Sequence, residues 1–187
     1  DVKNLVKWVS EISERVDLLH KYGHLSITPR CAGTDMSGGA IGESIIMDFS
    51  RYMTRLIGGP LPIDKNSWSI TVEPGMFYRD FEKLTLAKGL ILPCYTASKS
   101  LNAMGGMYGN NSAGERTLKY GKTEDYILEA KVVFADGNEY VMKPLSKREL
   151  EKKMAQGDYE GEIYKKVFAL INENKTEIEQ AKPKVHK

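Results

Sequence analysis

"MGGMYGNNSAGERTLKYGKTEDYILEAKVVFADG", residues 104–137, joins a glycine-rich segment to a run of strand-forming residues. In "YILEAKVVFADGNEYVMK", two such runs flank Asp136 and Gly137, a dipeptide typical of tight hairpin turns. The segment Tyr95–Thr123 is rich in Gly, Asn, Ser and Ala and shows little periodicity. A loop of that length inside a compact domain usually has a function, and its glycines and amides suit a flat polar ligand. The stretch therefore predicts a ligand-facing loop followed by a β-hairpin.

A second glycine-rich loop, "TPRCAGTDMSGGA", covers residues 28–40. We expect a short strand in "HLSITPR" before it and a mostly buried strand in "SIIMDFS" after it. Its backbone N–H groups, the charge of Arg30 and the hydroxyls of Thr34 and Ser37 would together form a phosphate cradle. An ordinary tight turn between two strands is equally compatible with the loop. It contains neither a G-K-[ST] ending nor a G-x-G-x-x-G motif leading into a helix, which disfavours a P-loop and a Rossmann site.

Helix and strand patterns cover most of the remaining chain. Apolar residues at helical spacing predict a helix over residues 2–16, and "FYRDFEKLTLAKG" predicts another that stops at Gly89. Alternating polar and apolar side chains in "SWSITVEPG" predict a strand. Beyond Pro144 the composition shifts to Lys, Glu and Gln, with helical patterns near residues 147–154 and 161–178. We expect these last helices to have little core of their own.

The composition excludes several classes of protein. With 41% hydrophobic residues, 28% charged residues and a net charge of +2, the chain is typical of a folded domain and has no basic footprint for nucleic acid. No apolar run approaches the roughly 20 residues of a membrane span. Cys31 and Cys94 fit neither a disulfide framework nor a zinc site, and His20, His24 and His186 lack metal-ligand spacing. We therefore expect a cytoplasmic protein without a metal.

Two separated glycine-rich loops suggest one extended ligand held at two places. Five ordered segments of the sequence carry a resemblance to a known family, and this resemblance implies which ligand it is. They are "PRCAGTDMSGGA", "IIMDFSRYM", "VEPG", "GLILP" and the stretch from Met104 to Gly137. In order and spacing this pattern resembles the FAD-binding domain of the vanillyl-alcohol oxidase and para-cresol methylhydroxylase (PCMH) type. The likeness covers about Leu5–Lys143 and is strongest to the glycolate oxidase and D-lactate dehydrogenase branch of the FAD-linked oxidases. It implies an α+β fold with mixed sheet lobes flanked by helices. We expect a partial FAD-binding domain over residues 1–145 and a helical extension over residues 146–187.

The resemblance also implies a set of cofactor-binding residues. The first loop would wrap the FAD pyrophosphate, a second segment would lie near the flavin and its diphosphate, and a third would line the isoalloxazine and ribityl region. In order, these are Arg30, Cys31, Ala32, Gly33, Thr34, Asp35, Met36 and Ser37; Tyr95, Ser98 and Ser100; and Gly105, Gly106, Asn111, Ser112, Ala113 and Gly114. The family has glycine where Cys31 and Asp35 stand, so we expect these side chains to crowd the pyrophosphate or constrain the backbone. The first loop has no histidine for covalent attachment, which implies non-covalent FAD.

The activity implied by the resemblance is the oxidation of a small 2-hydroxy acid, lactate-like or glycolate-like, by hydride transfer to the flavin. An unidentified acceptor would then take the electrons. Two alternatives stay open: a catalytically silent flavin-binding fragment, and an FAD enzyme of the same fold with another substrate, such as UDP-N-acetylenolpyruvoylglucosamine reductase. Arg116, Lys119 and Tyr120 would contact substrate or flavin, or would form a solvated turn with an aromatic anchor. No catalytic residue is assigned.

Family enzymes of this type continue into a cap domain, which leads us to expect that the sequence is a fragment. An unpaired sheet edge or apolar face would then be left accessible, which predicts self-association or a loosened terminal helix.

Overall fold

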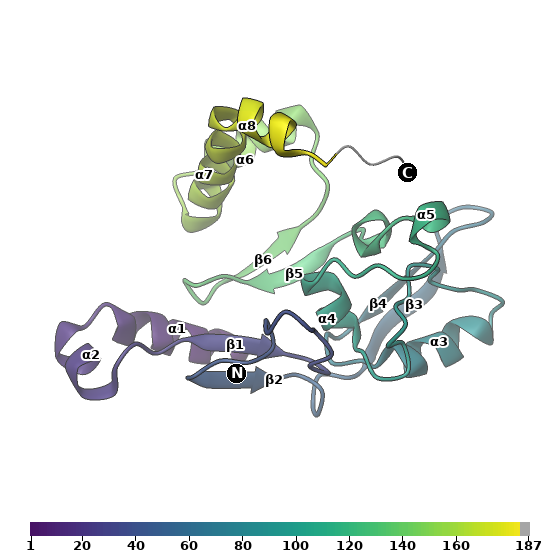
Figure 1. Ribbon diagram of the computed structural model, residues 1–187, viewed down its shortest axis with the longest axis horizontal. Coiled ribbons are helices and arrows are strands. Elements are labelled where there is room, and N and C mark those ends of the chain that lie inside the picture. The colour runs from purple at the N-terminus through teal and green to yellow at the C-terminus, as the bar shows by residue number, and fades with distance from the viewer. Residues whose placement is uncertain (184–187) are drawn as a thin grey trace. The chain divides into compact units, whose positions relative to one another are not determined.

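The computed structural model describes residues 1–183, so His186, one of the histidines considered above, lies outside the described residues. The chain divides into two compact units (Figure 1). The central unit is Glu11–Ile127, and the terminal unit combines Asp1–Ser10 with Leu128–Lys187. Among the described residues, no helix is long and apolar enough to cross a membrane.

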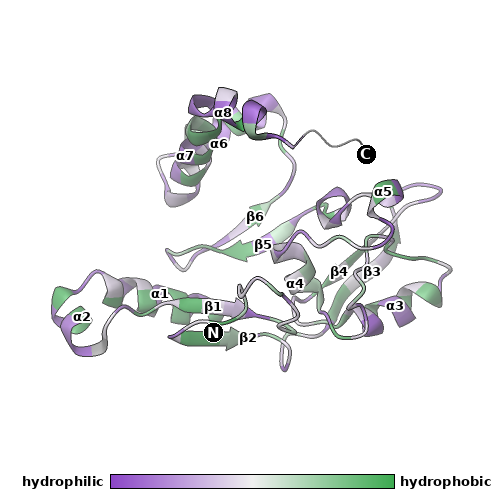
Figure 2. Ribbon diagram, viewed as in Figure 1, coloured by the Kyte–Doolittle hydropathy of each residue, from purple (hydrophilic) through white to green (hydrophobic). Residues whose placement is uncertain are grey.

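The first sheet of the central unit pairs β1 (Ile27–Arg30) with β2 (Ile45–Asp48) in parallel, and Arg30 stands opposite Asp48. Both strands were predicted, and the glycine-rich first loop connects them. The prediction that the second strand is mostly buried is wrong, because its residues alternate between half-buried and exposed and Ile46 is 43% exposed. Only two strands pair here among the described residues, so the hydrophobic side chains of β2 (green in Figure 2) stay partly accessible.

The second sheet pairs β3 (Leu56–Pro62) antiparallel with β4 (Trp68–Val72). Only β4 was predicted. Strand β3 carries Gly58, Gly59 and Pro60, which are residue types that disfavour strands, and its register is irregular around them. Gly59 has φ +101°, and a β-carbon there would lie 2.6 Å from the Ser69 carbonyl oxygen, so the close strand approach requires glycine.

The core of the central unit forms around α3 (Tyr78–Leu86), the predicted helix, after which Gly89 takes φ +70°. Tyr78 is fully buried, and its ring centroid lies 5.9 Å from that of Phe81 and 6.1 Å from that of Tyr95. Met76, Cys94 and Met107 complete the buried cluster. The core therefore includes Tyr95, which the resemblance places near the flavin and its diphosphate.

The long loop expected over Tyr95–Thr123 is partly helical. It contains α4 (Met104–Gly109) and α5 (Thr117–Tyr120), and the 3₁₀ helix η1 (Thr123–Tyr126) follows. Three glycines give α4 a poor intrinsic helix propensity, which hides it from sequence periodicity. Met107 is 1% exposed in the core, so tertiary packing rather than propensity stabilises this helix.

At the N-terminal end, the single helix predicted over residues 2–16 is in fact α1 (Val2–Ser13) followed by α2 (Val16–Tyr22). Arg15 has extended backbone angles between them.

The terminal unit contains the predicted hairpin of β5 (Ala130–Val133) and β6 (Glu139–Met142). Its turn residue Gly137 has φ +76°, and a β-carbon there would lie 2.7 Å from the β-carbon of Lys7. Helix α6 (Lys147–Met154) follows where it was predicted, and the single helical pattern predicted over residues 161–178 is in fact two helices, α7 (Tyr159–Glu173) and α8 (Lys175–Ala181). This unit includes the hairpin as well as the helices; the domain boundary at residue 145 stays a prediction.

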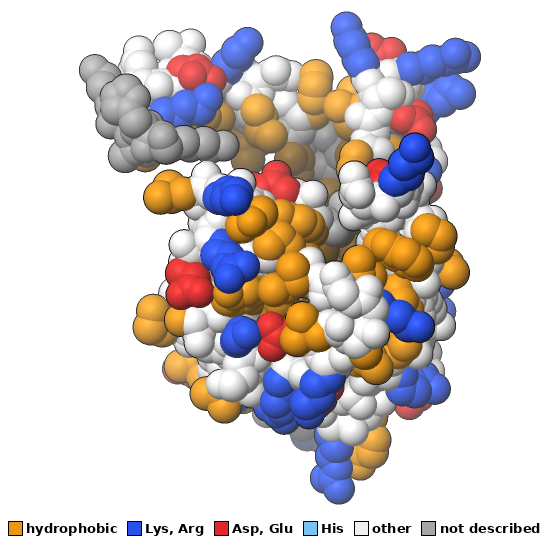
Figure 3. All heavy atoms as spheres, turned by 90° about the vertical axis from the view of Figure 1, so that its right-hand side faces the viewer, with side chains coloured by type: hydrophobic (Ala, Val, Ile, Leu, Met, Phe, Trp, Pro, Cys, Tyr) orange, Lys and Arg blue, Asp and Glu red, His pale blue; other side chains and the backbone are white. Residues whose placement is uncertain are grey.

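Many large hydrophobic side chains remain accessible in both units. Figure 3 shows them in orange on one face, interspersed with Lys and Arg in blue. On α7 they include Val167, Phe168, Leu170 and Ile171, and on β3 Leu61 is 61% exposed. Accessible apolar surface favours association, and self-association of this chain stays a prediction.

Candidate functional site

Among residues 1–183, the first glycine-rich loop leaves backbone N–H groups without an acceptor beside the Arg30 guanidinium. Gly33 has φ +66°, and a β-carbon there would lie 2.5 Å from Arg30 Nη2, so the guanidinium lies across the glycine. Within the described residues, the N–H groups of Ala32, Gly33 and Thr34 donate no hydrogen bond. Successive free N–H groups beside a guanidinium can bind a phosphate. The guanidinium of Arg30 occupies the space that a side chain at residue 33 would fill, which explains the glycine there. This arrangement is compatible with the phosphate-cradle interpretation.

The side chain of Asp35 is directed back into its own loop. Its carboxylate accepts a hydrogen bond from the Gly39 N–H at 2.7 Å and from the Ser37 hydroxyl at 2.9 Å. These hydrogen bonds hold the pKa of Asp35 below its ordinary value, so the group is anionic at neutral pH. Neither Cys31 nor Asp35 has positive φ, so neither departure from glycine strains the backbone.

The two glycine-rich segments meet at Pro74. The Cys31 thiol donates to the Pro74 carbonyl oxygen at 3.3 Å, and the Gly105 N–H donates to the same oxygen at 2.7 Å. A β-carbon on Gly105 would lie 2.9 Å from Cys31 Sγ, whereas one on Gly106 would come no closer than 3.7 Å to Cys31. Burial raises the pKa of the Cys31 thiol, which keeps it protonated. Cys31 therefore joins the first loop to α4.

The segment of Tyr95, Ser98 and Ser100 is partly buried. Tyr95 belongs to the core, Ser98 Oγ lies 2.9 Å from Thr96 Oγ1, and Ser100 is exposed. Asn102 Nδ2 donates to Thr96 Oγ1 at 2.8 Å, but Asn102 Oδ1 is buried and has no partner among the described residues. An unpaired buried acceptor is costly. Sequence reasoning missed Asn102, because nothing but its position before the glycines of α4 distinguishes it.

The segment Asn111–Gly114 is held firmly by its neighbours. Asn111 has φ +45°, and its side-chain oxygen accepts from the Glu124 N–H at 3.0 Å. Ser112 is buried, and its carbonyl oxygen accepts from the N–H and the hydroxyl of Thr123. A β-carbon on Gly114 would lie 1.8 Å from the Tyr95 carbonyl oxygen, so only glycine allows this approach.

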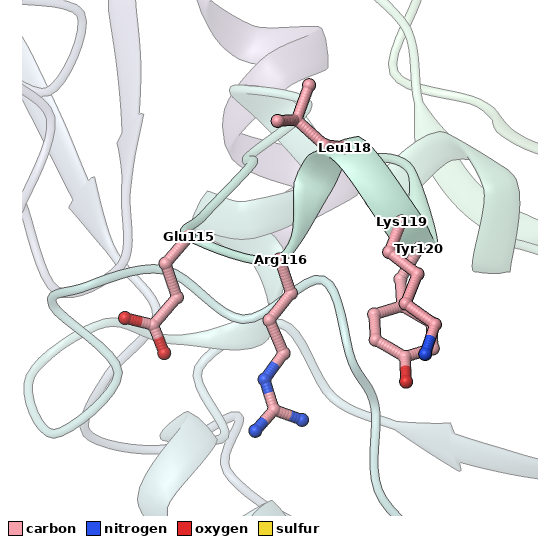
Figure 4. Close-up of a pocket in the computed structure, with 5 residues that line it drawn as sticks. All are labelled: Glu115, Arg116, Leu118, Lys119 and Tyr120. Carbon is pink, nitrogen blue, oxygen red and sulfur yellow. The ribbon is translucent and has the colours of Figure 1, made fainter. Parts of the chain in front are cut away.

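A surface hollow of about 410 Å³ follows this segment. It is lined by Glu115, Arg116, Leu118, Lys119 and Tyr120. In Figure 4, the Glu115 and Arg116 side chains project to the same side, and Leu118 projects away from them. Glu115 accepts a hydrogen bond from the Tyr95 hydroxyl at 3.2 Å, and Arg116 Cζ lies 5.4 Å from the Tyr95 ring centroid. Sequence reasoning missed Glu115, because its partner is twenty residues away in the chain.

The expected site residues thus fall into two contacting groups. Cys31 lies against Gly105 and Gly106, and Tyr95 lies against Gly114. Met36 is fully exposed, and within the described residues the Ser37 hydroxyl bonds only to Asp35, so the structure brings neither side chain to the other segments. In the part of the chain that the structure describes, no group of His, Cys, Asp and Glu side chains forms a metal site.

Known proteins are similar to this chain in sequence. Residues 5–142 match the family of the FAD binding domain. The glycolate oxidase subunit GlcD of Bacillus subtilis (strain 168) is 33% identical over 129 residues, which cover 68% of this chain and 26% of that protein. The D-2-hydroxyglutarate dehydrogenase of Escherichia coli (strain K12) is 27% identical over 173 residues, which cover 92% of this chain and 17% of that protein.

Among solved structures, alkyldihydroxyacetonephosphate synthase aligns with a TM-score of 0.56 and 22% identity, covering 85% of this chain and 26% of that one. The oxidase of 6-hydroxy-D-nicotine from Arthrobacter nicotinovorans aligns with a TM-score of 0.55 and 24% identity, covering 78% of this chain and 30% of that one. These likenesses confirm the expected α+β, PCMH-type fold. The chain spans 26% and 17% of the two curated relatives. From the match over residues 5–142, the chain belongs to the FAD binding domain family of FAD-linked oxidases, in which FAD is the cofactor.

Proposed function

We propose that this chain supplies part of the FAD site of an oxidoreductase that oxidises a small 2-hydroxy acid. The relatives described above are named for glycolate and D-2-hydroxyglutarate, and a D-lactate dehydrogenase of Archaeoglobus fulgidus is 29% identical over 130 residues. The observation that carries the proposal is the meeting of the two glycine-rich segments at the Pro74 carbonyl oxygen. One extended cofactor can therefore contact both segments.

The chemistry of the described residues fits FAD. The free N–H groups of Ala32, Gly33 and Thr34, with the Arg30 guanidinium, offer donors for the pyrophosphate. Gly106 is exposed, and a β-carbon there would make only an ordinary contact with Cys31 at 3.7 Å, so a flat ring can approach its backbone. The binding set that we propose is the one implied by the sequence.

In this proposal, bound FAD supplies the redox chemistry by accepting a hydride from the 2-hydroxy acid. The chain's own residues bind and orient the cofactor: Arg30 offsets phosphate charge, and the rigid segment Asn111–Gly114 fixes one wall of the site. Non-covalent binding is proposed because residues 28–40 contain no histidine. The electron acceptor is proposed to be a separate partner of the whole protein.

A titration with FAD tests the cofactor site. We expect saturable quenching of flavin fluorescence by the chain, and binding about tenfold weaker for Arg30→Ala, because a charge-assisted contact to phosphate is lost. Arg148→Ala, which removes an exposed arginine on α6, is the matched control and should bind as the unchanged chain does. Equal binding by both variants would contradict the role of Arg30.

Anaerobic mixing of the FAD-loaded protein with glycolate, D-lactate or D-2-hydroxyglutarate tests the substrate class. Bleaching of the flavin absorbance by at least one of these acids is the expected result for the whole protein. Tight FAD binding without bleaching by any 2-hydroxy acid would retain the cofactor site and reject the proposed substrate class.

A further inference from the structure

Tyr95 connects two segments that are far apart in the sequence. Its ring packs in the core at 6.1 Å from the ring centroid of Tyr78, and only 8% of the residue is exposed. Its hydroxyl reaches out of the core and donates to Glu115 Oε1 at 3.2 Å. Glu115 directly follows Gly114, so this hydrogen bond joins the core to the end of the segment Asn111–Gly114.

Two cations lie on the same aromatic ring. Lys99 Nζ lies 4.6 Å from the Tyr95 ring centroid and Arg116 Cζ lies 5.4 Å from it. Lys99 also donates to Glu82 Oε1 on α3 at 2.8 Å, and this hydrogen bond raises the pKa of Lys99 above its ordinary value. Arg116 has no carboxylate partner within the described residues. The ring of Tyr95 is therefore the contact that orients the Arg116 guanidinium.

The backbone makes the third connection. Gly114 lies so close to the Tyr95 carbonyl oxygen that only glycine fits there. The Gly114 N–H donates to the Thr117 hydroxyl at 2.8 Å, and this hydroxyl donates to the Gly114 carbonyl oxygen at 2.7 Å. Gly114, at the end of the segment Asn111–Gly114, therefore contacts Tyr95 through the backbone, and the next residue, Glu115, contacts it through the side chain. We call Tyr95, Glu115 and Arg116 the Tyr95 cluster.

We propose that Glu115 and Arg116 are positioning residues that act through Tyr95 to fix the segment Asn111–Gly114 against the flavin. This inference rests on the proposed FAD site. It deepens that proposal, because neither side chain belongs to the binding set, yet both control the wall that the set forms. A carboxylate and a guanidinium on one tyrosine also place opposite charges beside this wall, so each substitution changes the local charge as well as the geometry.

A double-mutant cycle on FAD affinity tests the cluster. Tyr95→Phe and Glu115→Ala should each weaken FAD binding about tenfold, because each removes the same charge-assisted hydrogen bond. The double variant should bind no more weakly than either single variant, since only one interaction is lost. Tyr140→Phe is the matched control: its hydroxyl donates to the Asp136 carboxylate at 2.5 Å in the terminal unit, and its loss should leave FAD affinity unchanged.

Arg116 is tested by conservative rescue. Arg116→Met should weaken FAD binding and alter the fine structure of the bound flavin spectrum, whereas Arg116→Lys should restore both, because lysine retains the cation on the ring. Thermal unfolding without FAD, followed by circular dichroism, separates this effect from loss of folding. If Arg116→Met and Arg116→Lys both lower the midpoint of thermal unfolding, the weaker FAD binding reflects a general loss of folding, and the positioning role of Arg116 is rejected.

Hydrogen exchange in the ligand-free chain makes the outcomes distinguishable. Tyr95→Phe and Glu115→Ala should speed amide exchange of Ser112–Gly114, and Tyr140→Phe should not. If the unchanged chain binds no FAD, the proposed function fails, and with it the flavin role of the cluster. If the unchanged chain binds FAD but the Tyr95 and Glu115 variants bind equally well, or additively more weakly, the inference is overturned and the proposed function stands.

Discussion

Cys31 and Gly105 donate to one acceptor, the carbonyl oxygen of Pro74, and thereby join two segments separated by more than seventy residues. The approach leaves no room for a side chain at residue 105, where a β-carbon would lie 2.5 Å from the β-carbon of Pro74. Glycine at this position is therefore a requirement of the fold.

Replacing Gly105 by alanine is expected to destabilise the ligand-free protein by about 1–3 kcal/mol, the usual cost of overpacking a tight contact. Gly106→Ala, one residue further along α4, is the control, because its β-carbon would make only an ordinary contact at 3.7 Å and alanine favours helices. Urea unfolding of both variants measures the difference. Equal stability of the two variants would show that residues 104–109 can move to accommodate a β-carbon at residue 105 without cost.

Asp35→Asn is expected to tighten FAD binding about fivefold, because it removes a negative charge beside the proposed pyrophosphate turn. The amide oxygen of asparagine can still accept from the Gly39 N–H, so the turn is retained. Asp64→Asn is the matched control: Asp64 accepts from Asn66 and Ser67 in the loop between β3 and β4. FAD titrations that show equal or weaker binding for Asp35→Asn would place the pyrophosphate elsewhere.

Glu73 predicts a pH dependence of stability. It is 9% exposed and accepts from Arg55 Nη2 and from the Arg55 N–H, both at 2.8 Å. The hydrogen bonds from Arg55 hold the pKa of Glu73 below its ordinary value in the folded state. Its contribution to the free energy of unfolding is therefore complete above the unfolded pKa of about 4.3 and is lost as the pH falls through the folded pKa.

Urea unfolding between pH 7 and pH 2 tests this. At pH 7, Glu73→Gln should have a lower free energy of unfolding than the unchanged protein. This difference should disappear as the pH falls toward 2. Glu129→Gln, at an exposed position, should follow the unchanged protein throughout. A difference in the free energy of unfolding that stays constant with pH would mean that the charge of the Glu73 carboxylate contributes nothing to stability.

Self-association is expected from the accessible apolar residues of α7. Light scattering should show a concentration-dependent mass for the chain, and replacing Leu170 and Ile171, both more than half exposed, by glutamate should reduce it. A monomer at all concentrations would count against this prediction.

Elements with clear apolar periodicity could be predicted from the sequence. Strand β4, helix α3 and the hairpin at Gly137 fall where their patterns place them. Strand β3 and helix α4 could not be predicted, because Gly59 and Pro60 in one and three glycines in the other act against their own elements. Both form because of tertiary contacts, which a local pattern does not contain.

The candidate site divides in the same way. The two glycine-rich loops were visible in the sequence, and the resemblance assigned them to one cofactor. The pairing of Tyr95 with Glu115 and the unpaired oxygen of Asn102 were not visible, because each depends on which side chains the fold brings together.

The terminal unit is built from both ends of the chain, since Gly137 packs against Lys3 and Lys7. During synthesis, residues 1–10 leave the ribosome long before the hairpin that they contact, whereas the central unit is one continuous stretch. The central unit is therefore able to fold first, and the terminal unit must wait for a long-range closure that slows its formation. Until that closure, the surface of Lys3 and Lys7 that Gly137 contacts stays uncovered.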